Sequence, residues 1–211
     1  MRLHQQLVNY ITELEEYILD HISIIYISIL ALSQKNIKKL IAYSSVAHMG
    51  FVTLGIFSRN LEGLQGAVFQ MISHGLISAA LFLSAGSLID RMQTKNIDDF
   101  GGLWKQMPIF SIFFLVYCLG AVSFPGTTGF IGEFLVLLGA FKINFLISFL
   151  AAFGIILSPC YILWLYNRVC FGNNNYTGIS DLNTKDTLVF FIFLLLIIIL
   201  GIYPNLLISV Y

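Results

Sequence analysis

The chain has 211 residues, of which 58% are hydrophobic and only 10% are charged, and its mean hydropathy is +0.86. Soluble domains carry about 25% charged residues, so this composition excludes a water-soluble globular protein and indicates an integral membrane protein in a lipid bilayer. The formal net charge of zero argues against nucleic acid as a partner.

Apolar segments long enough to cross a bilayer follow one another along the chain. In chain order they are Tyr17–Ser33, Ile37–Phe57, Leu64–Ile89, Ile109–Phe141, Ile143–Phe171 and Thr187–Val210. The first is short, the fourth is too long for one span and is interrupted at Pro125, and Pro159 predicts a kink in the fifth. The sequence therefore predicts an all-α, polytopic membrane helix bundle of about six transmembrane helices.

The segment that precedes these spans differs from them in composition. Met1–Asp20 is too polar and too acidic for a signal peptide. We expect residues 1–20 to be a separate polar segment and residues 21–211 to form the membrane domain.

The basic residues divide unequally between the two sides that six alternating spans define. One side collects Lys35, Lys38, Lys39, Arg91, Lys95, Lys105, Arg168 and Lys185, and the other Arg2, Arg59 and Lys142. By the positive-inside rule the first side faces the cytoplasm or the mitochondrial matrix. This division supports the count of six spans.

A line of titratable residues runs through the apolar segments. Within the third span, Gln70, Ser73 and His74 interrupt an apolar run, and Gln70 and His74 lie four apart on one helix face. This pattern favours a wet interior stripe in which His74 relays protons, although a lone histidine in an apolar helix is often structural. In the second span, Lys38 precedes His48 by ten residues. Lys38 is either part of this line or an interfacial cation that reaches back to the membrane surface.

Glu133 is the only acidic residue inside an apolar stretch, and it follows the break at Pro125. A carboxylate in hydrocarbon is costly and usually functional, and broken helices at membrane depth are typical of ion-translocating sites. Gly126, Gly129 and Gly132 lie between them at steps of three, which fits close helix packing, an opening in the backbone that admits water, or both.

No other chemistry is indicated. Cys118, Cys160 and Cys170 form no CxxC pair and show no metal spacing with the four histidines, so we interpret them as small core residues. The sequence contains no nucleophile triad, P-loop or dinucleotide fingerprint. The sequence therefore predicts no metal or cofactor site in this chain.

Several motifs resemble one known family. The segments that carry the resemblance are Lys35–Phe51, Gln65–Ala67, Gln70–Gly75, Leu81–Leu83, Gly101–Trp104, Pro125–Thr127, Gly129–Phe134 and Tyr203-Pro204. Together they resemble the antiporter-like membrane subunits of proton-pumping NADH:quinone oxidoreductase, respiratory complex I, and are most similar to the subunit 4 or chain M family. The resemblance covers roughly residues 22–211.

The resemblance implies a fold of roughly fourteen helices that includes two inverted repeats of about five. This chain would carry one five-helix repeat with a discontinuous helix plus one further helix, which is the C-terminal half of such a subunit. Lys38, His48, His74 and Glu133 would be the proton-translocating groups of its half-channel. NADH, FMN, iron–sulfur clusters and quinone would be bound by other subunits. The partners implied are other membrane subunits of complex I and an N-terminal half of the same subunit.

The resemblance leaves alternatives open. A subunit of a multi-subunit Na⁺/H⁺ antiporter or of a membrane-bound hydrogenase would share most of these motifs, and a fragment that inserts without transporting would share all of them. The compartment would be a bacterial cell membrane or a mitochondrial inner membrane.

Overall fold

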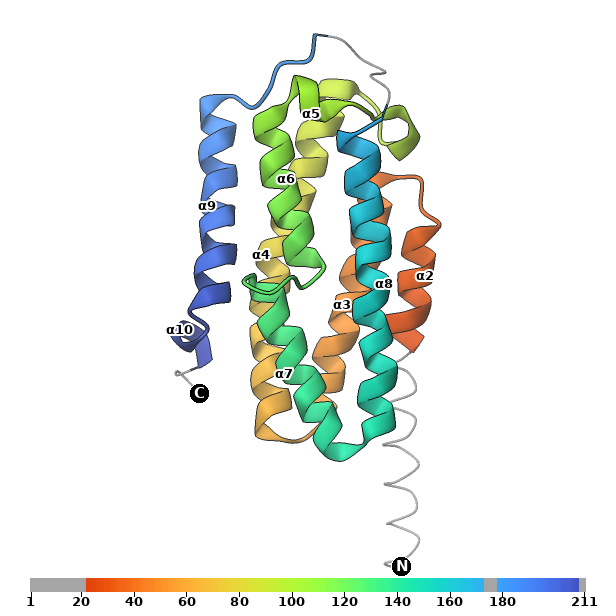
Figure 1. The fold of residues 1–211 in the computed structure, drawn as a ribbon, viewed down its shortest axis with the longest axis vertical. Coiled ribbons are helices and arrows are strands. Elements are labelled where there is room, and N and C mark those ends of the chain that lie inside the picture. The colour runs from red at the N-terminus through yellow and green to blue at the C-terminus, as the bar shows by residue number, and fades with distance from the viewer. Residues whose placement is uncertain (1–21, 173–177, 209–211) are drawn as a thin grey trace, which may run out of the picture.

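The computed structural model describes residues 22–172 and 178–208, and this part of the chain is a bundle of helices without a strand (Figure 1). A π-helical turn η1 (Ile22–Tyr26) continues into α2 (Ile27–Leu32), which is followed by α3 (Ile37–Phe57) and α4 (Leu61–Met92). The short elements η2 (Ile97–Asp99) and α5 (Leu103–Gln106) come next. The remaining helices are α6 (Pro108–Ala121), α7 (Thr128–Ile143), α8 (Phe145–Cys170), α9 (Thr184–Ile202) and α10 (Asn205–Ile208).

The predicted spans correspond to these helices. Of the described residues, α3, α4, α8 and α9 form the four helices that are long and apolar enough to cross a bilayer. The shorter apolar segment Ile22–Leu32 is the described part of the first span, and α6 with α7 is the interrupted fourth. The all-α membrane bundle predicted from the sequence is therefore confirmed. The sixth span is shorter than predicted, because α9 ends at Ile202, ahead of Pro204, and Val210 lies outside the described residues.

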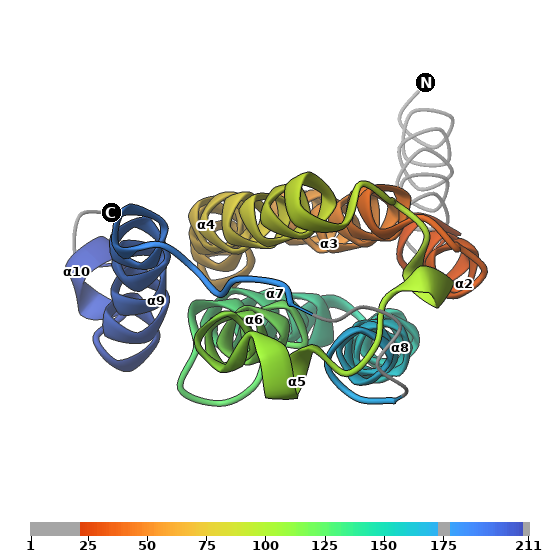
Figure 2. The same cartoon turned by 90° about the horizontal axis from the view of Figure 1, so that it is seen from above.

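The helices lie in two layers. Seen from above, α2, α3 and α4 form one layer and α6, α7 and α8 the other, while α9 and α10 stand beside α4 at one end (Figure 2). Large aromatic side chains fill the space between helices, and among the described residues the largest fully buried ones are Phe69, Phe110, Phe114, Tyr117, Tyr161 and Phe190.

Small residues set the distance between the two layers. A Cβ atom at Gly66 of α4 would lie 2.6 Å from the backbone nitrogen of Val136 on α7. A Cβ atom at Gly132 of α7 would lie 2.9 Å from the Cα atom of Gln70 on α4. Both distances are too short for a side chain, so these glycines allow α4 and α7 to meet backbone to backbone. Of the two interpretations of the glycines in this region, close packing holds for Gly132.

The break between α6 and α7 spans residues 122–127. The loop contains two residues with positive φ, Ser123 at 55° and Gly126 at 94°, and α7 then continues in the same direction as α6 (Figure 1). The interruption predicted at Pro125 is therefore present. The end of α9 packs against this break, since a Cβ atom at Gly201 would lie 2.5 Å from the carbonyl carbon of Thr127.

The basic residues gather as predicted. The upper end of the bundle in Figure 1 carries the starts of α3 and α9 and the ends of α4 and α8, and with them the larger group of lysines and arginines. Arg59 and Lys142 lie at the opposite end, next to the starts of α4 and α8, while Arg2 lies outside the described residues. Acidic partners offset some of this charge, for example Asp98 with Arg168 at the basic end and Glu62 with Lys142 at the other.

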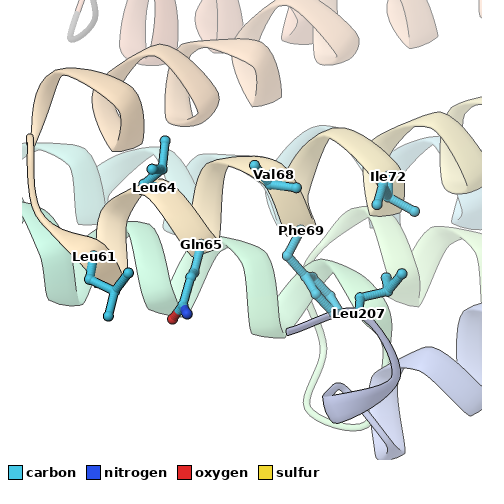
Figure 3. Close-up of a pocket in the computed structure, with 7 residues that line it drawn as sticks. All are labelled: Leu61, Leu64, Gln65, Val68, Phe69, Ile72 and Leu207. Carbon is cyan, nitrogen blue, oxygen red and sulfur yellow. The ribbon is translucent and has the colours of Figure 1, made fainter. Parts of the chain in front are cut away.

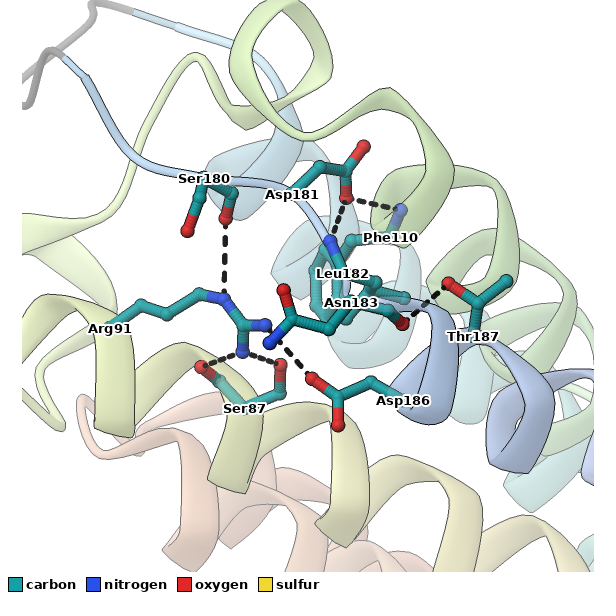
Figure 4. Close-up of polar contacts among 9 residues, drawn as sticks. All are labelled: Ser87, Arg91, Phe110, Ser180, Asp181, Leu182, Asn183, Asp186 and Thr187. Atoms are coloured by element: carbon teal, nitrogen blue, oxygen red, sulfur yellow. Dashed lines mark hydrogen bonds and ion pairs between the residues drawn. The ribbon is translucent and has the colours of Figure 1, made fainter.

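Arg91 ties α9 to the rest of the bundle at the basic end (Figure 4). Its guanidinium donates hydrogen bonds to Ser87 of α4, to the carbonyl oxygen of Ser180 at 3.3 Å and to Asp186 of α9 at 3.1 Å. Nearby, the carboxylate of Asp181 accepts hydrogen bonds from the first backbone N–H groups of α6 at 2.9 and 3.2 Å. Such a carboxylate satisfies the unpaired donors of a helix N-terminus.

An apolar groove of about 320 Å³ opens between α4 and α10 (Figure 3). Its lining consists of Leu61, Leu64, Gln65, Val68, Phe69, Ile72 and Leu207. Except for Gln65, these side chains are those expected of a surface that meets hydrocarbon.

Pro159 and Cys160 are neighbours in the middle part of α8. Pro159 lies inside this helix, which runs without interruption from Phe145 to Cys170. Cys160 is exposed on the outside of α8, so its interpretation as a core residue was wrong, whereas Cys118 and Cys170 are buried as predicted. Because α8 is apolar on all sides, its sequence does not indicate which face is buried.

Candidate functional site: a buried carboxylate at a helix break

Glu133 lies in the second turn of α7, directly after the break, and its side chain is buried with 1% exposure. Its Oε1 atom lies 2.7 Å from Nδ1 of His48 on α3 and accepts a hydrogen bond of 3.3 Å from Nε2 of Gln70 on α4. Three helices therefore meet at one carboxylate. A buried carboxylate is tolerated when it is hydrogen-bonded and paired in this way.

His74 belongs to a second polar group beside the first. Its Nε2 atom lies 2.8 Å from the hydroxyl of Ser45 on α3, and that hydroxyl is 3.2 Å from the hydroxyl of Ser78 on α4. The rings of His48 and His74 are neighbours, with centroids 6.1 Å apart and planes tilted by 43°. The Ser45–His74–Ser78 group and the His48–Glu133–Gln70 group are thus neighbours within one polar core.

Two small cavities lie along this polar core. One is lined by His48, Gln70, His74, Ile77, Gly120, Ala121, Ser123, Gly129 and Glu133, and the other by Ile41, Ser44, Ser45, His48, His74, Ile77, Ser78, Leu81 and Ala121. Each has a volume of about 10 Å³ for the centres of water molecules, which is the lower limit for one ordered water. Both cavities touch His48 and His74, so one water in either place would join the two groups.

Several buried polar atoms around Glu133 are unpaired. Among the described residues, no hydrogen-bond partner exists for Nε2 of His48, Oε1 of Gln70 or the hydroxyls of Ser73, Ser123 and Thr128. Buried polar atoms in native proteins nearly always have partners, and water commonly supplies those that the protein lacks. Three of the residues with unpaired atoms line the cavity beside Glu133, namely His48, Gln70 and Ser123.

Three of the four residues selected from the sequence come together here, and Lys38 does not. Lys38 is exposed in the first turn of α3 at the basic end of the bundle, where its backbone N–H is capped by the side chain of Asn36. It precedes His48 by ten residues, which is about 15 Å along a helix. The structure thus places Lys38 where an interfacial cation would lie, at a distance from the buried groups.

Gln70 and Glu133 are both sheltered from lipid within this chain. Gln70 is 2% exposed and Glu133 is 1% exposed, because the α4–α7 contact encloses both side chains within this chain alone. Only His74, together with Ser45 and Ser78, remains partly accessible. Sequence reasoning missed Ser78, although its position four residues after His74 on the same helix face was a signal that could have found it.

The described residues contain no group of three His, Cys, Asp or Glu side chains that could hold a metal ion. The groups that surround Glu133 are hydrogen-bonding and titratable side chains. An imidazole beside a buried carboxylate can exchange a proton with it without separating charge over a long distance.

Comparison with known proteins identifies the family. The model of the family described as "NADH:quinone oxidoreductase/Mrp antiporter, TM" matches residues 3–158. The chain is 52% identical over 192 residues to the NADH-ubiquinone oxidoreductase chain 4 of Marchantia polymorpha, and these residues are 90% of this chain and 39% of that protein. It is 48% identical over 193 residues to the NADH-quinone oxidoreductase subunit M of Rhodobacter capsulatus, with 90% and 38% covered. The chain thus spans about two fifths of the length of these relatives.

Solved structures agree with these relatives. A chain of respiratory complex I from Thermus thermophilus superimposes with a TM-score of 0.86 at 32% identity, and the match covers 92% of this chain and 42% of that one. A chain of the Mrp complex from Dietzia sp. DQ12-45-1b shares the fold, with a TM-score of 0.84 at 16% identity, over 93% of this chain and 45% of that one. The chain is a multi-pass membrane protein, of a bacterial cell membrane or a mitochondrial inner membrane. It belongs to the NADH:quinone oxidoreductase/Mrp antiporter transmembrane family.

Proposed function

We propose that the chain forms part of a proton-translocating membrane subunit of an NADH:quinone oxidoreductase, with Glu133 as the acid that loads and releases the proton. The observation that carries this proposal is the buried contact between Glu133 and His48 at the break that precedes α7. The identities of 52% and 48% to subunits with that name support the enzyme complex. NADH, flavin, iron–sulfur clusters and quinone would be bound by other subunits.

The two nitrogens of His48 would have different roles, because a proton would enter at one and leave from the other. Nδ1 shares a proton with Oε1 of Glu133 across 2.7 Å, while Nε2 has no partner among the described residues. A proton that arrives at Nε2 drives the shared proton onto Glu133, so that the imidazole passes one proton while it gains another. Gln70 holds the carboxylate in place through the same oxygen atom. The arriving proton raises the net charge of the buried pair by one, until Glu133 releases its proton.

His74 would supply His48. Its ring lies next to that of His48, and its hydrogen bond to Ser45 fixes the ring orientation. The cavity between the two histidines can hold one water, which would close the gap between the rings. Lys38 would act at the start of this route, at the basic end of α3. Its exposed position requires hydrated space between Lys38 and Ser45 in the assembled protein.

An Na⁺/H⁺ antiporter subunit is the second candidate, and a hydrogenase subunit is a third. The Mrp complex shows the same fold, but at 16% identity that likeness concerns the fold alone. The high identity to NADH-quinone oxidoreductase subunits favours the first candidate.

The partners would be other membrane subunits and an N-terminal half of the same subunit. The surface that this half would cover is the outer face of the α3–α4 layer, where Ser45, His74 and Ser78 are only partly buried. In hydrocarbon, an uncovered polar group costs free energy on the order of several kcal/mol. Coverage by a second repeat would remove this cost and enclose the route.

Replacement of His74 or Lys38 by Ala is expected to lower NADH-driven proton uptake more than it lowers assembly of the complex. A relay group affects transfer between its neighbours, whereas a packing or topology residue affects the amount of assembled protein. The measurement compares proton uptake in inverted membrane vesicles with the amount of complex on native gels. Lys39 is the matched control for Lys38, since both are exposed in the first turn of α3. Equal effects of Lys38→Ala and Lys39→Ala would show that Lys38 acts only through topology.

Expressed alone, the chain is expected to conduct no protons and to persist poorly in the membrane. The half-exposed group at His74 would face lipid, and the route would lack its second half. Proton flux is measured in vesicles reconstituted with the chain alone and again with a separately expressed N-terminal half of a relative such as the Rhodobacter capsulatus subunit. Robust flux from the lone chain would contradict the half-subunit proposal and favour an independent transporter.

A further inference from the structure

Ser123, in the break between α6 and α7, is a buried residue in an unfavourable backbone conformation. Its φ of 55° lies in the left-handed region, where a side chain costs free energy that glycine avoids. In the described part of the chain, two other non-glycine residues share this conformation, Arg59 and Gln93, and both are exposed next to helix ends. Ser123, in contrast, is 7% exposed. Glycine would suit this backbone better, so the turn alone does not account for a serine here.

The hydroxyl of Ser123 lies next to the buried carboxylate. It has no hydrogen-bond partner among the described residues. It lies against the first turn of α7, since a Cβ atom added to Gly129 would be 3.1 Å from its oxygen. Glu133 follows Gly129 by four residues and therefore lies one turn further along the same face of α7. Ser123, Gly129 and Glu133 line the same cavity, so the serine and the carboxylate border one space.

The unpaired atoms favour one of the two cavities that touch both histidines. The lining of the cavity at the break brings three such atoms, Oγ of Ser123, Oε1 of Gln70 and Nε2 of His48. Of the described residues that line the second cavity, only His48 brings one, because the serine hydroxyls there have partners within the chain. An ordered water needs roughly two to four polar partners, and the cavity at the break offers them.

The donors and acceptors of these three groups fit a single water. Oε1 of Gln70 is an acceptor, because the amide nitrogen of the same side chain donates to Glu133. Nε2 of His48 is also an acceptor when Nδ1 carries the proton shared with Glu133. The hydroxyl of Ser123 can donate. A water that accepts this hydroxyl proton therefore points its own two protons at Gln70 and at Nε2 of His48.

We propose that Ser123 is a positioning residue, which holds one water in the cavity at the break and aims it at Nε2 of His48. This inference rests on the proposed function and names the group through which His48 receives its proton. In the step, an N–H bond of protonated His74 breaks and an O–H bond forms on the water. The O–H bond of the water that points at His48 breaks, and an N–H bond forms at Nε2 while the proton on Nδ1 moves to Glu133. The water is restored, and Ser123 keeps its own proton throughout.

Ser123→Gly tests the inference, because it removes the hydroxyl and suits the backbone at this position. NADH-driven proton uptake per assembled complex is expected to fall by about tenfold or more, the order of loss that follows when a reacting group is misplaced. Assembly and thermal stability are expected to be kept, since relief of the backbone offsets the lost hydrogen bond. The remaining uptake is expected to show a larger solvent isotope effect in D₂O than that of the unaltered protein, because proton transfer has become rate-limiting.

Ser123→Ala separates positioning from packing. It also lacks the hydroxyl but keeps the strained backbone, so it is expected to lose the same share of uptake as Ser123→Gly at a lower thermal stability. If Ser123 served packing alone, the loss of uptake would follow the loss of stability and neither variant would change the isotope effect.

Two matched controls lie outside the polar core. Gln93→Gly relieves the same positive φ at the exposed end of α4, and it is expected to keep or raise stability and to leave uptake unchanged. Ser111→Ala removes a buried hydroxyl of α6 that donates to the carbonyl oxygen of Met107 across 2.8 Å. It is expected to leave uptake per assembled complex unchanged.

The outcomes separate this inference from the proposed function. Full uptake by Ser123→Gly, with none by Glu133→Gln in the same vesicles, would overturn the positioning role of Ser123 and leave the role of Glu133 intact. Full uptake by Glu133→Gln would overturn the proposed function itself. If Ser123→Gly fails to assemble, Ser123→Ala decides: reduced uptake at normal assembly supports the inference, whereas full uptake overturns it. Failure of both variants to assemble would show that the hydroxyl is structural and would also overturn the inference.

Discussion

Replacement of Glu133 by Gln is expected to abolish NADH-driven proton uptake, with a loss of about 100-fold or more, the scale of a lost general acid–base group. Gln has nearly the same shape and keeps an oxygen that can accept hydrogen bonds from His48 and Gln70. It cannot bind and release a proton near neutral pH, so only the transfer step is removed. Proton uptake is measured in inverted membrane vesicles after native gels confirm normal assembly.

Two further variants sharpen this result. Glu133→Asp keeps the acid but draws it back from His48, and it is expected to retain part of the uptake. Glu62→Gln is the matched control, since Glu62 is an acid at the start of α4 that pairs with Lys142 at the bundle end and lies outside the polar core. It is expected to leave uptake unchanged. Normal uptake by Glu133→Gln would refute the assignment of Glu133.

Replacement of Gly66 by Ala is expected to produce a large loss of stability. The added Cβ would lie 2.6 Å from the backbone nitrogen of Val136 and 2.8 Å from the Cβ atom of Leu135 on α7. Since backbone atoms cannot move aside independently, α4 and α7 must separate, at a cost of about 1–3 kcal/mol. The same separation would pull Gln70 and His48 away from Glu133, so proton uptake is expected to fall together with stability.

Gly75 provides the matched control on the same helix. A Cβ atom there would meet nothing within 4 Å. Gly75→Ala is therefore expected to stabilise the helix by up to about 1 kcal/mol, the difference in helix propensity between the two residues. Thermal loss of the chain from detergent-solubilised membranes compares the two variants. Equal stability of Gly66→Ala and Gly75→Ala would show that the α4–α7 contact is looser than described.

Most features of the site could be predicted from the sequence, because each of them depends on a few neighbouring residues. The break at Pro125, the acid that follows it and the polar face at Gln70 and His74 can each be read within a few residues. Local sequence, however, gives only the position of a side chain along its own helix. It does not give the rotation of one helix against another, and this rotation decides which side chains meet.

Lys38 and His48 illustrate that difference. Both lie on α3 and both were selected as members of one line of titratable groups. In the fold, His48 meets Glu133, a residue 85 positions later, while Lys38 stays exposed at the end of the helix.

The composition and the pattern of apolar segments by themselves determined that this is an integral membrane protein with about six transmembrane helices. They also determined that it carries one acid beside a broken helix. These properties follow from the cost of polar groups in hydrocarbon, which acts on every residue independently. Only the tertiary structure decided that Glu133 and Gln70 are sheltered within this chain and that His48 is the partner of the acid. The physical reason is the close contact at Gly66 and Gly132, which sets the distance and rotation of α4 and α7 and thereby brings separate helices to one carboxylate.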